Sequence, residues 1–274
     1  MDFLKRFLVA VVGIPAIYLL ALLGSWYFLL FVALQVGLAA KEFYSLADKK
    51  ELKPFAGLGI LLATILPVVS FLALKTNHPV LPISGVMFSL IVAAASALLL
   101  ARDLKDAIAR ISVTAFGILY VGGLLSFQIL LRHDPQYSER EGFHWLLLAY
   151  LITWSIDVGS YAFGRLFGRH KLCPVLSPGK TVEGLFGGLV FSLAVSYGVG
   201  ACLMGVFNPV SAIVFGVIIS LVAPAGDLFE SIFKRDAGVM DSSGLLPGHG
   251  GVLDRFDSLI FTVPATYVFR CFIH

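Results

Sequence analysis

Long apolar segments recur along the whole chain. They cover residues 7–24, 26–40, 56–74, 80–100, 111–131, 144–167, 182–207, 209–225 and 256–272. A helix needs about 20 mostly apolar residues to cross the hydrocarbon core of a bilayer. Inside that core the backbone must satisfy its own hydrogen bonds, so spanning segments of this kind are helical. The sequence therefore predicts an all-α integral membrane protein with about nine transmembrane helices.

The composition excludes a water-soluble globule. Only 14% of the residues are charged, 58% are hydrophobic, and the mean hydropathy is +0.92. Soluble domains carry about 25% charged residues, so lipid must cover much of this surface. The net charge of +3 gives no indication of nucleic-acid binding. The three cysteines show no paired spacing, so we expect neither a disulfide framework nor a zinc site.

The basic residues are distributed unevenly between the two sides of the membrane. If the N-terminus is cytoplasmic, nearly all of the 20 Lys and Arg residues lie in cytoplasmic segments. The exceptions are Lys75, Arg132, Arg140 and Arg270. Cytoplasmic loops of membrane proteins carry an excess of Lys and Arg. This orientation is therefore favoured, with the polar loops 168–180 and 226–255 facing the cytoplasm.

The acidic residues divide the chain into two parts. Before residue 150 they fall in predicted loops or at the N-terminus. Later ones lie in or beside apolar segments, namely Asp157, Glu183, Asp227, Glu230, Asp236, Asp241, Asp254 and Asp257. Ionisable residues within membrane segments are expensive and usually functional. We expect residues 1–140 to form a transmembrane scaffold and residues 141–274 to form a catalytic transmembrane domain.

The first polar cluster surrounds Asp157. Asp157, Ser160, Tyr161 and Gly164 are spaced so that they share one face of a helix. A charged side chain near the bilayer centre costs about 2.5–3.5 kcal/mol on insertion scales. Asp157 is therefore predicted to face the bundle interior and to be functional. The alternative is a structural Asp paired with a basic residue such as Arg165.

The second polar cluster is the segment 177–184. Ser177 and Pro178 are typical of the N-cap and first position of a helix. Lys180 would then lie in the first turn, where free N–H groups and the helix dipole favour a phosphate. A P-loop is excluded because Pro174 occupies the position of its first glycine. The remaining alternative is an ordinary capped helix with an interfacial lysine.

The third polar cluster covers residues 226–258. It contains Asp227, Glu230, Ser231 and Lys234 on one predicted helical face, a glycine-rich loop with His249, and then Asp254, Asp257 and Ser258. Carboxylates are hard oxygen ligands for Mg²⁺, and Lys234, Arg235 and Arg255 could neutralise phosphate oxygens. The combination is typical of phosphoryl or nucleotidyl transfer. The alternative is a cytoplasmic loop of self-neutralising ion pairs.

The third cluster closely resembles the signature of the phosphatidate cytidylyltransferases, also called CDP-diacylglycerol synthases. The matching residues are Ser231, Lys234, Arg235, Asp241 and the run from Leu246 through Gly248, His249, Gly250, Gly251 and Asp254 to Asp257. Asp157 and the segment 177–181 resemble that family's other motifs. Two positions depart from the pattern. Met240 replaces a lysine, which removes one possible phosphate contact, and Gly179 stands where a basic or polar residue is usual.

The resemblance implies a reaction and its partners. CTP and phosphatidic acid would give CDP-diacylglycerol and pyrophosphate, in membrane lipid and without nucleic acid. It also implies an all-helical fold of about nine spans and a homodimer. The magnesium-containing site can include a second, monovalent cation (K⁺). The expected location is a bacterial inner (plasma) membrane, with the active site facing the cytoplasm.

The resemblance also suggests roles for individual residues. Asp227 and Asp254, with Asp157 nearby, would bind the metal, and Lys180, Lys234 and Arg235 would hold phosphate groups. His249 would orient CTP or donate a hydrogen bond, although a lone loop histidine is often only structural. The remaining predicted substrate contacts are Ser177, Asp241, Gly248, Gly250, Gly251 and Arg255.

Two other functions are compatible with these features. A CTP-dependent polyprenol kinase would release CDP instead of pyrophosphate. A membrane transporter is the non-enzyme alternative, since intramembrane acids and broken helices also mark ion pathways. A transporter would produce flux without a covalent product, and its polar residues would be spread over both halves of the chain.

The predicted orientation can be tested through Cys173, which lies in the 168–180 loop. Because this loop is expected to face the cytoplasm, a membrane-impermeant thiol reagent should label Cys173 only after cells are permeabilised. Labelling of Cys173 from outside intact cells would show that the orientation is reversed.

Overall fold

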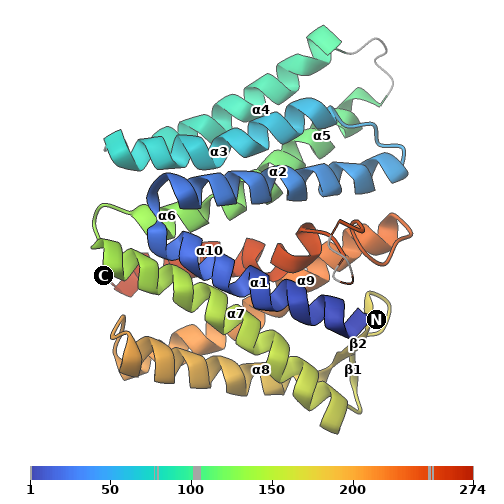
Figure 1. Cartoon of the computed structure of the whole chain (residues 1–274). Coiled ribbons are helices and arrows are strands. Elements are labelled where there is room, and N and C mark those ends of the chain that lie inside the picture. Colours follow the sequence, from blue (N-terminus) through green and yellow to red (C-terminus); the bar gives the residue numbers. More distant parts are fainter. Residues whose placement is uncertain are drawn as a thin grey trace. The chain divides into compact units, whose positions relative to one another are not determined.

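A computed structural model describes residues 2–76, 78, 80–100, 106–245, 248 and 250–273, and these are almost entirely helical. The helices are α1 (Asp2–Leu23), α2 (Ser25–Lys49), α3 (Ala56–Thr76), α4 (Leu81–Leu100), α5 (Ala107–Gly117), α6 (Phe127–His133), α7 (Glu139–Phe167), α8 (Val182–Val195), α9 (Pro209–Asp236) and α10 (Leu253–Ile273). Two π-helical stretches, η1 (Ile118–Gly123) and η2 (Ser196–Leu203), continue α5 and α8. Figure 1 uses the same labels for the helices and strands.

Most of these helices are suited to a membrane. Within the described residues, seven helical segments are long and apolar enough to cross a bilayer: Ser25–Lys49, Ala56–Thr76, Ala107–His133, Glu139–Phe167, Val182–Leu203, Pro209–Asp236 and Leu253–Ile273. Two shorter apolar helical stretches, Val11–Leu23 and Leu81–Ser96, join them. Each predicted apolar segment coincides with a helix. The all-α membrane fold is therefore confirmed, and nine stays an approximate number of spans.

The chain forms two compact units. The first contains Met1–Tyr137 and Asp236–Phe256, and the second contains Ser138–Arg235 and Asp257–His274. Helix α10 begins in the first unit and continues in the second. The functional division near residue 140 stays a prediction.

In the first unit, α3 packs against both α2 and α4 (Figure 1). Leu62, Leu66, Ala93 and Ile118 form a buried apolar cluster at this junction. The backbones approach closely because a Cβ atom at Gly122 of η1 would lie only 2.7 Å from the Cα of Ala63. Small residues thus allow tight helix packing, as is usual within membranes.

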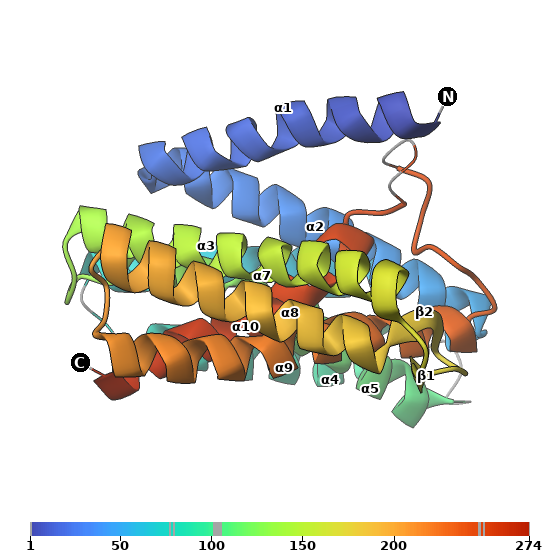
Figure 2. The same ribbon diagram turned by 90° about the horizontal axis from the view of Figure 1, so that it is seen from below.

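In the second unit, α7 and α8 lie side by side, as both ribbon views show (Figures 1 and 2). A Cβ atom at Gly187 would lie 2.6 Å from the carbonyl oxygen of Gly159, and one at Gly184 would lie 2.8 Å from that of Ser160. Gly188 lies on the same contact, since a Cβ atom there would lie 2.6 Å from the Ser160 hydroxyl oxygen. The same holds for Gly164, whose Cβ would meet the Cα of Gly184 at 3.7 Å.

Helices α9 and α10 join this pair through polar and glycine contacts. Ser192 of α8 and Ser196 of η2 donate hydrogen bonds of 2.6 Å to the carbonyl oxygens of Gly216 and Ala212 on α9. A Cβ atom at Gly226 of α9 would lie 2.7 Å from the carbonyl oxygen of Asp257 on α10. This close approach at Gly226 brings the polar end of α9 against α10.

A short antiparallel hairpin connects α7 to α8. It consists of β1 (Lys171–Cys173) and β2 (Ser177–Thr181). The predicted helix start at Ser177 and Pro178 is therefore wrong. Thr181 is the N-cap instead, and its side chain accepts a 3.0 Å hydrogen bond from the Gly184 N–H. Pairing with β1 holds the preceding residues extended until this cap.

The three cysteines are free, as expected. Cys173 lies on β1 and is partly accessible, whereas Cys202 and Cys271 are exposed.

The α7–α8 contact predicts a stability effect at Gly187. A methyl group there would meet the Gly159 carbonyl oxygen and the Phe163 side chain, and overpacking of this kind costs about 1–3 kcal/mol. Gly187→Ala should therefore lower the thermal unfolding temperature of the detergent-solubilised protein. Gly198→Ala is the matched control, because a Cβ atom at Gly198 would meet nothing within 4 Å. Equal unfolding temperatures for the two variants would contradict the packing described here.

Candidate active site

The candidate active site of the second unit is centred on an ion pair between β2 and α9. The ammonium of Lys180 lies 2.8 Å from Oδ2 of Asp227 and 3.5 Å from the carbonyl oxygen of Pro224. Lys180 is on strand β2 and not in the first turn of a helix as predicted. Its ammonium therefore contacts a carboxylate, whereas the prediction placed it beside the free N–H groups of a helix N-terminus.

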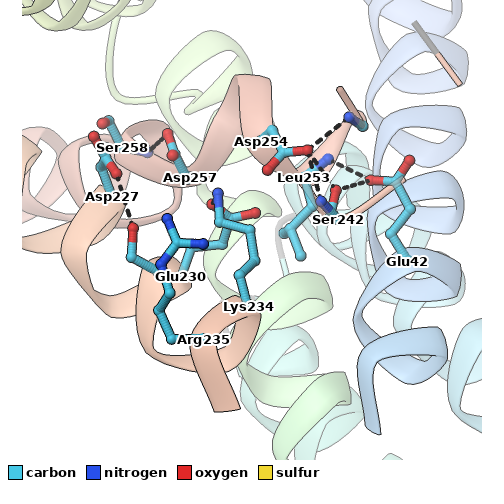
Figure 3. Close-up of polar contacts among 12 residues, drawn as sticks. Glu42, Asp227, Glu230, Lys234, Arg235, Ser242, Leu253, Asp254, Asp257 and Ser258 are labelled. Carbon is cyan, nitrogen blue, oxygen red and sulfur yellow. Dashed lines mark hydrogen bonds and ion pairs between the residues drawn. The ribbon is translucent and has the colours of Figure 1, made fainter. Parts of the chain in front are cut away.

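The polar face of α9 has the predicted helical spacing. The Ser231 hydroxyl donates a 3.4 Å hydrogen bond to Oδ1 of Asp227. One turn further on, Lys234 lies 2.5 Å from the fully buried Glu230. Figure 3 shows Asp227, Glu230 and Lys234 projecting from the same helix. The predicted face of Asp227, Glu230, Ser231 and Lys234 is thus confirmed.

Asp257 adds a further carboxylate from α10. Its Oδ1 accepts a 2.5 Å hydrogen bond from the Ser258 N–H (Figure 3). Gly226, which precedes Asp227, approaches the Asp257 carbonyl oxygen, so the acids of α9 and α10 lie on adjoining helices. Two lysines, Lys180 and Lys234, form ion pairs with the acids of α9. Such a cluster attracts cations, because neighbouring carboxylates repel one another unless positive charge is supplied.

Asp157 differs from its prediction in one respect. It lies on α7, but its side chain is exposed and not enclosed in the helix bundle. The prediction that Asp157 faces the bundle interior therefore disagrees with its exposure, and Gly159, not Asp157, is the residue of this turn that faces α8. Arg165, the alternative partner of Asp157, donates a 2.9 Å hydrogen bond to the Tyr161 hydroxyl.

Arg235 and the hairpin form a second contact of this site. The Nε–H of Arg235 donates a 3.1 Å hydrogen bond to the carbonyl oxygen of Leu176 in the hairpin turn. Ser177, at the start of β2, follows directly. At the base of the hairpin, Glu183 accepts hydrogen bonds from the Arg169 and His170 backbone and from the His170 ring. Arg235 thus fixes the hairpin turn, and a phosphate role for it stays a prediction.

The glycine-rich loop belongs to the first unit and is organised by Asp254. Oδ2 of Asp254 accepts hydrogen bonds from the Ser242 N–H at 2.9 Å, the Ser242 hydroxyl at 2.8 Å and the Gly251 N–H at 2.7 Å. Gly250 has a φ of +80°, and a Cβ atom there would lie 2.6 Å from the same oxygen. Glycine is therefore required at position 250 by both conformation and space.

The other predicted loop residues lie close to one another in the chain but have different surroundings. Asp241 and Arg255 are exposed, as is Met240, which replaces the family's lysine. Gly248 has a φ of +77°. His249 lies outside the described residues, so its predicted role stays a prediction.

Glu42 is a site residue that the sequence analysis missed. It was grouped with the loop acids because the second apolar segment was expected to end at residue 40. Helix α2 continues to Lys49, and Glu42 is buried with only 5% of its surface exposed. The available signal was the apolar run Phe43, Tyr44, Leu46 and Ala47, which extends the helical pattern beyond the predicted end.

The carboxylates of the second unit offer oxygen ligands of the kind that a magnesium ion binds. No group of three or more His, Cys, Asp or Glu residues in the described part of the chain is arranged to hold a metal by itself. Mg²⁺ is commonly bound by only one or two carboxylates, with waters and substrate phosphates completing its shell. Asp227, alone or with one neighbouring carboxylate, has the donor chemistry of such a site, and magnesium binding stays a prediction. The predicted pairing of Asp227 with Asp254 involves residues of different units and stays a prediction.

Comparison with known proteins gives a consistent assignment. The model of the Cytidylyltransferase family matches residues 4–273. A phosphatidate cytidylyltransferase of Synechocystis sp. is 32% identical over 287 residues, which cover 97% of this chain and 95% of that protein. The enzyme of the same name from Staphylococcus aureus is 52% identical over 130 residues, or 46% of this chain and 49% of that protein. The chain therefore belongs to the phosphatidate cytidylyltransferase family.

Proposed function

We propose that this chain transfers the cytidylyl group of CTP to phosphatidate, forming CDP-diacylglycerol and pyrophosphate. The family match supports the reaction class. The observation that carries the proposal is the ion pair of Lys180 with Asp227, at the point where Gly226 of α9 approaches Asp257 of α10. Such a site can assemble the cations and phosphates that nucleotidyl transfer requires.

The chemistry needs charge neutralisation more than proton transfer. A phosphate oxygen of phosphatidate attacks the α-phosphorus of CTP, the bond from this phosphorus to the bridging α–β oxygen breaks, and pyrophosphate leaves. The nucleophile is already an anion, so no strong general base is required. The obstacle is the repulsion between two polyanions, and fixed positive charge lowers it.

Asp227, with Asp157 and Asp257 as neighbours, would hold Mg²⁺ in the second unit. When bound, Mg²⁺ neutralises phosphate charge and stabilises the developing charge on the leaving group. Lys180 sits against Asp227, so its ammonium is available next to the same phosphates. Asp254 has one oxygen committed to three hydrogen bonds, and we assign it first to holding the glycine-rich loop.

The remaining parts of the proposal concern the surroundings of the enzyme. The distribution of basic residues supports an active site that faces the cytoplasm, where CTP is found. The bacterial relatives support a bacterial inner membrane. We also propose a homodimer and a second, monovalent cation such as K⁺, and both rest on the family resemblance alone.

A direct assay tests the reaction. Purified protein is incubated with phosphatidic acid, Mg²⁺ and CTP labelled in its α-phosphate. Labelled lipid and pyrophosphate are the expected products. Release of CDP with a phosphorylated lipid alcohol would indicate the kinase alternative, and vesicle flux without any labelled lipid would indicate a transporter.

The carboxylate cluster predicts a large effect at Asp227. Asp227→Asn keeps the size of the side chain but removes its charge, so activity should fall by about 10²–10³-fold, as it does when other transition-state charge stabilisers are lost. Asp236→Asn is the matched control, because Asp236 is exposed and pairs with Lys50 within the first unit. EDTA should inactivate the wild type and Mg²⁺ should restore it. Near-normal turnover of Asp227→Asn, or activity in excess chelator, would overturn the metal assignment.

Lys180 has its own expected effect. Lys180→Ala removes the ammonium beside Asp227 and should raise the KM for CTP or phosphatidate several-fold, whereas Lys180→Arg should recover part of the loss. Lys171→Ala controls for the hairpin, because Lys171 is on β1 and its ammonium donates a hydrogen bond to the Pro178 carbonyl oxygen. Unchanged kinetics of Lys180→Ala at subsaturating substrates would leave Lys180 as an interfacial lysine.

A further inference from the structure

Glu42 lies in α2, within the half of the chain expected to be only scaffold, and none of the roles described above uses it. We propose that Glu42 is a positioning residue that fixes the glycine-rich loop and the start of α10 in their catalytic conformation. Its role in activity rests on the proposed function. The geometric part of the proposal stands on the contacts of its carboxylate.

The carboxylate of Glu42 lies within hydrogen-bond distance of four donors of the loop segment. Oε1 accepts from the Ser243 hydroxyl at 2.6 Å and from the Val252 N–H at 3.0 Å. Oε2 accepts from the Ser242 hydroxyl at 3.1 Å and from the Leu253 N–H at 2.7 Å (Figure 3). The Ser242 hydroxyl has a single proton, which Glu42 and Asp254 share, while the Ser243 hydroxyl and the Val252 and Leu253 N–H groups also donate to Glu42. These contacts commit the Glu42 carboxylate to the loop segment.

Two of these bonds cap a helix from a distance in sequence. Leu253 is the first residue of α10, and the first N–H groups of a helix have no partner within it. A negative charge at this end is also favoured by the helix dipole. The cap comes from a residue 211 positions away and not from the adjoining loop. The beginning of α10 is thus tied directly to α2.

Ser242 links Glu42 to Asp254. Its hydroxyl oxygen lies 3.1 Å from Oε2 of Glu42 and 2.8 Å from Oδ2 of Asp254, while its backbone N–H donates to Asp254. The two carboxylates therefore hold the same serine. A shift of Glu42 would be transmitted through Ser242 to Asp254 and to the loop residues that Asp254 binds.

The glycine at position 251 is explained by the same contact. A Cβ atom at Gly251 would collide with Oε2 of Glu42 and with the Ser242 hydroxyl. The last glycine of the loop is thus needed so that the Glu42 carboxylate can reach the backbone. This requirement connects a residue of α2 to the glycine-rich sequence itself.

The test uses Glu42→Gln in the full-length protein. Glutamine has one oxygen and one NH₂ group, so its NH₂ group would face the backbone N–H of Val252 or Leu253, and two donors cannot bond to each other. The serine hydroxyls can rotate to accept from the NH₂ group, whereas a backbone N–H can only donate. We expect kcat to fall by about 10²-fold, the scale of a small misplacement of reacting groups, with a smaller change in KM. Glu51→Gln is the matched control, because Glu51 is exposed just after the same helix.

Amide hydrogen exchange provides a measurement that does not depend on activity. Peptides containing Val252 and Leu253 should exchange faster in Glu42→Gln than in the wild type and in Glu51→Gln, while peptides of α7 and α8 should be unchanged. Because exchange needs no substrate, it separates failure of this inference from failure of the proposed function. Unchanged exchange at these two amides would overturn the inference.

A double-mutant cycle with Ser242→Ala tests the proposed connection. If Glu42 acts through Ser242, the two substitutions should together reduce kcat by less than the product of their separate effects. Independent, multiplicative effects would contradict the link, as would a loss of activity that only follows the loss of folded protein. If Glu42→Gln does not fold, Glu42→Asp, which keeps the charge but withdraws it from the loop, decides by the same measurements.

Discussion

The structure depends on neutralising carboxylates that apolar helices carry into poorly hydrated surroundings. Each unit does this differently. In the second unit, Asp227 and Glu230 lie against the ammonium groups of Lys180 and Lys234. In the first unit, Glu42 lies within hydrogen-bond distance of four hydroxyl and backbone donors. A buried charge is tolerated only when it is paired or hydrogen-bonded, so these contacts determine where the surrounding helices can lie.

Glycine makes the acidic cluster of the second unit possible. Gly226 lets α9 approach the backbone of α10 at Asp257, and Gly159 and Gly187 bring α7 against α8. A larger residue at Gly226 would separate α9 from α10 and so move the carboxylate of Asp227 away from that of Asp257. Tight packing and electrostatic coupling therefore have the same cause. The distance between the carboxylates of Asp227 and Asp257 therefore depends on how closely the two backbones pack.

Hydropathy and helical spacing were sufficient to predict the helices and the polar face of α9, because both depend on local periodicity. The hairpin was not predictable in this way. Its strands are short, and Ser177-Pro178 matches a helix start until the pairing with β1 is known. Glu42 was missed because its partners, Ser242 to Leu253, lie some 200 positions away. The exposure of Asp157 likewise depends on which face of α7 packs against α8.

The two acids at the start of α10 illustrate how neighbouring residues of one motif can have different surroundings. Asp254 is buried, and one of its oxygens accepts three hydrogen bonds from the loop that precedes the helix. Asp257, one turn later, accepts a hydrogen bond from the next backbone N–H. Hydrogen-bond donors therefore satisfy much of the Asp254 carboxylate, whereas Asp257 lies where α10 meets α9 at Gly226. Two acids three residues apart thus have different surroundings, because one faces a loop and the other a neighbouring helix.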